Sequence, residues 1–75
     1  MDAERIKVLV QGIDADEAFA DHFAALSRIA RDRGDRSVAN AFARHGRLHR
    51  VKAIEMRAIL VAFGTLSSLL DHGLR

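Results

Sequence analysis

Residues 37–63 contain no proline, and Gly46 is their only glycine. Apolar side chains recur along this stretch at the three- and four-residue steps of an α-helix. A second helical run, over about residues 16–33, precedes it and ends at Gly34, a residue that suits the left-handed position after a helix. Because the connection is as short as Gly34-Asp35, the two helices must lie antiparallel. The sequence therefore predicts an antiparallel helical hairpin.

The length of the chain limits what can stabilise this hairpin. Its 75 residues leave room for a single helical domain, residues 1–75, with a limited core. The chain contains no cysteine, which excludes disulfides and cysteine zinc sites and fits a reducing cytoplasm. The hydrophobic content of 49% is too high for a disordered segment. Self-association is the remaining common route to stability.

The sequence indicates a cytoplasmic location and no membrane contact. The N-terminus opens MDAERIKVLV, with acids where a secretory signal would carry basic residues. The most apolar stretch, residues 58–70, is too short to span a bilayer and is interrupted by Gly64.

Both ends of the chain are expected to form short flanking helices. Asp2 could cap a helix over residues 2–11 that Gly12 ends, although the alternating apolar residues of RIKVLVQ also fit a strand. A lone strand would have no partner in this chain, which favours the helix. Residues 65–72 are expected to form another short helix after a break at Gly64.

Apolar side chains predict the inward faces of the two main helices. In the first, the residues at steps of four, three and four are Phe19, Phe23, Leu26 and Ala30. In the long helix, the residues within one narrow sector are Val38, Phe42, His45, His49, Lys52, Met56, Leu60 and Phe63.

The C-terminal half of the long helix is apolar on nearly all sides from Ile54 onward. One neighbouring helix can cover only one of these sides, so a partner surface is implied. We therefore predict an all-α fold in which the hairpin, with its flanking helices, pairs into a dimeric four-helix bundle. The residues expected in the interface are Phe42, Ile54, Met56, Ile59, Leu60, Val61, Phe63, Leu66 and Leu69.

Charge is distributed unevenly along the chain. Residues 1–27 carry a net charge of −4, whereas residues 28–57 carry +6. An outward stripe that could contact phosphates or an acidic partner is formed by Arg44, Arg47, Arg50 and Arg57. No aromatic residue stands among these arginines to stack on bases. We favour a solvated surface, with nucleic-acid binding as the alternative.

The histidines offer a second alternative, a small metal-binding bundle. His45 and His49 are four residues apart, a spacing that can place two imidazoles on one metal ion. His22 lies at about the same level of the antiparallel hairpin. The favoured interpretation is that these side chains are hydrogen-bonded or solvated, because no HExxH or ExxH motif accompanies them. We expect no cofactor.

An enzyme is not expected. The sequence contains no glycine-rich phosphate loop, and its serines lack a recognisable base arrangement. The interpretation favoured overall is a small interaction or regulatory module that binds another macromolecule as a homo-oligomer.

Residues 23–49, FAALSRIARDRGDRSVANAFARHGRLH, resemble the first helical hairpin of rubrerythrin and other ferritin-like proteins. The shared pattern is an A-R-x-x-G turn before a small-residue helix with a phenylalanine, here Ala30, Arg31, Gly34, Ala39 and Phe42. The resemblance implies a hairpin that pairs into a four-helix bundle. The diiron ligands of that family come as Glu-x-x-His on the second helix, where this chain has His49 and Lys52. The resemblance therefore implies no iron site.

Overall fold

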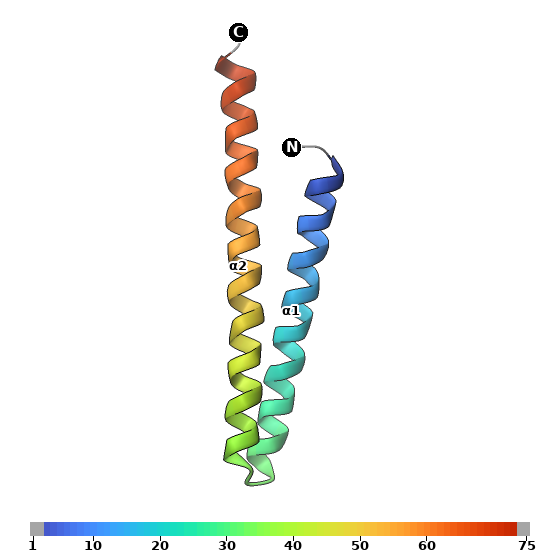
Figure 1. Ribbon diagram of the computed structural model, residues 1–75, viewed down its shortest axis with the longest axis vertical. Helices are drawn as coiled ribbons and strands as arrows, with labels where there is room; N and C mark the ends of the chain where they lie inside the picture. Colours follow the sequence, from blue (N-terminus) through green and yellow to red (C-terminus); the bar gives the residue numbers. More distant parts are fainter. Residues whose placement is uncertain (1–2, 74–75) are drawn as a thin grey trace.

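The computed structural model describes the backbone of residues 3–73 and the side chains of residues 3–65. This part of the chain forms two helices, α1 (Ala3–Asp32) and α2 (Arg36–Gly73). The helices lie antiparallel and are joined by a short turn (Figure 1). The prediction of an all-α antiparallel hairpin is confirmed.

The prediction of separate flanking helices is wrong. Residues 3–11 are helical but continue through Gly12 into the rest of α1, and α2 passes through Gly64 without a break. A glycine inside a helix costs only about 1 kcal/mol relative to alanine, which its neighbours can offset. At Gly12 the side chain of Met56 covers the glycine, since an added Cβ would lie 2.9 Å from the Met56 sulfur.

The turn is built by Gly34 and Asp35. Gly34 has a positive φ of 81°, and its amide donates to the Arg31 carbonyl at 3.0 Å. The Asp35 amide donates to the Ala30 carbonyl at 2.9 Å, which completes a Schellman motif at the end of α1. The Asp35 carboxylate then accepts from the Val38 amide at 3.1 Å and caps α2. One aspartate thus ends one helix and begins the next.

Mostly small side chains form the line along which the helices touch. Buried positions recur every seventh residue in each helix, at Ile13, Ala20 and Ser27 in α1 and at Ala39, Gly46 and Ala53 in α2. A Cβ added to Gly46 would lie 3.4 Å from both the Ala20 carbonyl oxygen and the Phe23 Cβ. Here the backbone of α2 rests almost directly on α1. We call this line the small-residue seam.

The predicted inward faces are displaced from this seam. Phe19 is 52% exposed, Val38 is 40% exposed, and His45 and Lys52 are also exposed. The helical spacing of the apolar side chains placed the phenylalanines on the inward face. Close approach instead requires small residues at the centre, so the larger side chains lie along its edge.

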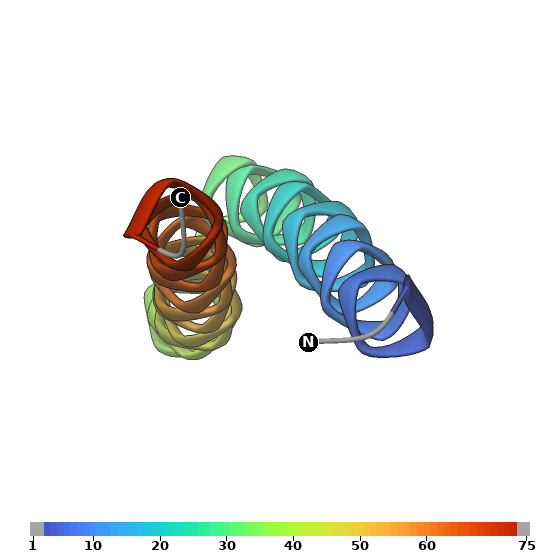
Figure 2. The ribbon, with the colours of Figure 1, turned by 90° about the horizontal axis from the view of Figure 1, so that it is seen from above.

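The helices are close together at the turn and diverge toward the other end (Figure 2). We call that end, residues 3–10 of α1 and 54–65 of α2, the open end. Several of its large apolar side chains are exposed, namely Ile6, Val8, Val10, Ile54, Ile59, Val61 and Phe63. Much of the apolar surface that the hairpin leaves uncovered therefore lies where the helices separate.

Candidate functional site

The small-residue seam separates two different surfaces. Asp16 and Glu17 are neighbours in α1, yet Asp16 contacts His49 and Glu17 contacts Arg57. Successive residues of a helix point about 100° apart, so these contacts lie on opposite sides of the seam. One side carries aromatic rings, and the other carries most of the interhelical ion pairs.

Phe23 is the centre of the aromatic surface. Its ring centroid lies 6.1 Å from that of Phe42, 5.5 Å from that of His45 and 5.7 Å from that of His49. The contacts with Phe42 and His49 are stacked. The rings of α2 therefore pack against a phenylalanine of α1 along the edge of the seam, which uses two of the predicted metal-site histidines in packing.

His49 also makes a polar contact that the sequence did not reveal. Its Nδ1 lies 2.7 Å from Oδ1 of Asp16, in a partly buried setting. The ring stacks on Phe19 at a centroid distance of 5.0 Å. A side chain held by a carboxylate and two phenylalanines has a defined structural role between the helices.

The histidines do not assemble a ligand set. His22 is exposed, and its ring centroid lies 6.1 Å from that of Phe23. Among the side chains of residues 3–65, no group of three His, Cys, Asp or Glu residues could hold a metal ion. Metal binding at His22, His45 and His49 thus stays a prediction from spacing alone.

A groove lies on the opposite side of the seam, in the half of the hairpin nearer the turn. Its volume is about 220 Å³. Small residues, including Ala24, Ala43 and Gly46, line its floor. Its rim carries four arginines, Arg28 and Arg31 from α1 and Arg47 and Arg50 from α2. We call this feature the arginine groove.

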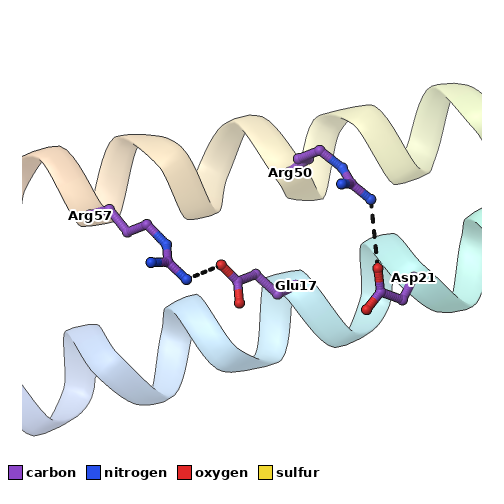
Figure 3. Close-up of polar contacts among 4 residues, drawn as sticks. All are labelled: Glu17, Asp21, Arg50 and Arg57. Atoms are coloured by element: carbon purple, nitrogen blue, oxygen red, sulfur yellow. Dashed lines mark hydrogen bonds and ion pairs between the residues drawn. The ribbon is translucent and has the colours of Figure 1, made fainter.

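Two of the predicted stripe arginines are paired with acids of α1 (Figure 3). Arg57 bonds Glu17 outside the groove. Arg50 lies 3.6 Å from Asp21, with the two side chains 59% and 82% exposed. An exposed pair at this distance contributes about 0–1 kcal/mol and is easily exchanged for another anion.

The other groove arginines have no such partner. In the part of the chain that the structure describes, Arg28, Arg31 and Arg47 form no ion pair. Arg44, the remaining stripe residue, is exposed and lies outside the groove lining. The sequence placed Arg47 and Arg50 on the outer side of α2. The spacing of the small residues was the signal that could have located the groove beside them.

The predicted interface residues fall into three groups. Phe42, Met56 and Leu60 are partly buried within the hairpin itself. Exposed positions at the open end are Ile54, Ile59, Val61 and Phe63. The side chains of Leu66 and Leu69 lie outside the described residues.

Comparison with protein-family models, curated proteins and solved structures finds no match to this chain. Across the described residues, neither helix contains a segment with the length and apolar character that crossing a membrane requires.

Proposed function

We propose that this chain is a small helical interaction module that acts as a homodimer, with a second copy packed on its open end. The observation that carries the proposal is exposure on two sides of α2. Ile59 and Phe63 are 45% and 38% exposed on one side, and Ile54 and Val61 are 60% and 67% exposed on another. α1 is a single helix and can cover only one side of α2.

The energetic argument starts from the small core of the hairpin. Among the described residues, the buried apolar side chains are Ile13 and four alanines, at positions 20, 30, 39 and 53. Fully burying one side chain the size of valine or phenylalanine contributes about 1.5–3 kcal/mol. A typical domain is stable by only about 5–15 kcal/mol. Covering a few side chains at the open end would therefore change the stability by a large fraction of the total.

A second copy is the partner that best fits this surface. Two identical hairpins supply four helices, the simplest bundle that surrounds a helix segment apolar on several sides. In a two-fold dimer each subunit contributes the same surface to the interface, so one set of apolar side chains is covered in both subunits. The helices diverge toward the open end (Figure 2), which is where these exposed apolar side chains lie.

Val61→Glu tests this arrangement, with Val51→Glu as the matched control. Both residues are exposed valines of α2, 67% and 49% exposed, but Val51 lies outside the open end. Val61→Glu should dissociate the dimer and lower its melting temperature, because a charge cannot be buried unpaired in the interface. Val51→Glu should leave the dimer intact. Light scattering after size exclusion measures the molar mass of each variant. Equal masses for the two variants would contradict the proposed interface.

A further inference from the structure

The four groove arginines approach one space from opposite directions. Arg28 and Arg31 lie near the C-terminal end of α1, whereas Arg47 and Arg50 lie farther from the turn, in α2. Helical side chains lean toward the N-terminus of their own helix. In an antiparallel pair these directions oppose each other, so the arginines of both helices converge over the small residues of the floor.

The dimensions of the groove limit the ligand. Its volume of about 220 Å³ is below the roughly 300–1,000 Å³ of sites for small organic ligands. A phosphate group is small enough to enter, and guanidinium groups bind its oxygens with paired hydrogen bonds.

The charge of the groove points to the same ligand. Asp21 is the one acid that the described residues place in an ion pair with a groove arginine, at 3.6 Å from Arg50. The charges on Arg28, Arg31 and Arg47 are left for an external anion. Such a concentration of one charge attracts phosphates strongly at low salt.

We propose that the arginine groove binds the sugar–phosphate backbone of nucleic acid without reading its sequence. No aromatic residue lines the groove, so it offers no ring on which a base could stack. Contacts with phosphates alone are independent of base sequence. Duplex DNA carries one charge per about 1.7 Å of its axis, and this density favours it over a single strand.

This binding is separate from the proposed self-association. The groove lies in the half of the hairpin nearer the turn, whereas the open end carries the exposed apolar residues. Neither Val61 nor Phe63 lines the groove. Loss of nucleic-acid binding and loss of the dimer can therefore be measured independently.

The test uses the full chain and a fluorescein-labelled DNA duplex of mixed sequence, with fluorescence anisotropy as the readout. The groove variant is Arg28→Gln with Arg47→Gln. The control is Arg36→Gln with Lys52→Gln, which removes the same charge from two exposed residues outside both the groove and the open end. The groove variant should bind at least ~10-fold more weakly. The slope of its log affinity against log salt concentration should also fall, by the amount that corresponds to about two phosphate contacts. The control should stay within about twofold of the wild type.

Further measurements distinguish the possible anions. A duplex of different sequence should bind equally well, and the corresponding single strand should bind more weakly. The proposal is overturned if the duplex fails to bind at low salt, or if the groove variant and the control lose affinity equally. It is also overturned if polyglutamate competes as well as DNA at equal charge, or if the chain prefers phosphatidylglycerol vesicles. Circular dichroism checks that both variants fold, and Arg47→Gln alone replaces the double variant if that one does not.

Discussion

The Ser27 hydroxyl donates a buried hydrogen bond of 2.8 Å to the carbonyl oxygen of Ala39. The bond joins α1 to α2 within the small-residue seam, and Ala39 is also the residue whose amide donates to the Asp35 carbonyl in the first turn of α2. The hydroxyl thus connects the seam to the start of the second helix. Serine thus provides a polar contact between the helices at a position where they approach closely.

Ser27→Ala should lower the free energy of unfolding by about 0.5–1.5 kcal/mol. The loss is modest because Ala39 lies inside α2, where its carbonyl keeps a helical hydrogen bond. Ser27→Leu should cost more, since the residue is 5% exposed and its hydroxyl contacts the backbone of α2 directly. Urea unfolding at fixed protein concentration measures both. A leucine variant as stable as the alanine variant would show that the seam is loosely packed.

The two buried or covered glycines should respond differently to substitution. A Cβ at Gly46 would lie 3.4 Å from the Ala20 backbone oxygen, so Gly46→Leu should separate the helices and cost about 1–3 kcal/mol. A Cβ at Gly12 would meet only the flexible end of Met56. Gly12→Ala should therefore be neutral or stabilising by up to about 1 kcal/mol. Thermal melts of the two variants compare them directly, and the reverse order would mean that the seam does not pass through Gly46.

Gly34→Val should destabilise the hairpin by about 1 kcal/mol or more, because a β-branched side chain is strained at a φ of 81°. No atom would crowd an added Cβ at this position, so the cost arises from the backbone alone. Gly34→Asn is the control, since asparagine tolerates this conformation better. Equal melting temperatures for the valine and asparagine variants would exclude a left-handed residue in the turn.

Asp16→Ala should cost about 1 kcal/mol, because it removes the partner of the His49 ring. Asp14→Ala is the control, because Asp14 is an exposed acid of the same helix and its loss should change stability by less than about 0.5 kcal/mol. The ring resonances of His49 in an NMR spectrum should move in the first variant and not in the second. Unchanged resonances in both would place Asp16 away from this ring.

Local signals in the sequence were sufficient to predict the hairpin. Gly34 and Asp35 encode the end of one helix and the start of the next through backbone conformation and one carboxylate, so the turn could be located without tertiary information. Gly12 and Gly64 are also glycines at which the sequence predicted a helix to end, but neither of them ends a helix. Whether an interior glycine ends a helix depends on the packing of the neighbouring turns, which a linear pattern does not contain.

The rotation of each helix about its axis could not be predicted from the helical spacing of the apolar side chains. Phe19 was assigned to the inward face and is 52% exposed, while Gly46 occupies the centre of the contact. The same rotation decides which arginines meet across the helices. Arg47 and Arg50 were recognised as outward residues of α2, but their convergence with Arg28 over the groove depends on how closely the backbones approach.

Sedimentation equilibrium of the wild-type chain tests self-association most directly. A chain of 8.3 kDa that buries its open end against a second copy should sediment at twice that mass at micromolar concentration. On dilution, the helical signal should fall together with the mass, because folding and association are coupled. A well-folded species of 8.3 kDa under these conditions would contradict the proposed dimer.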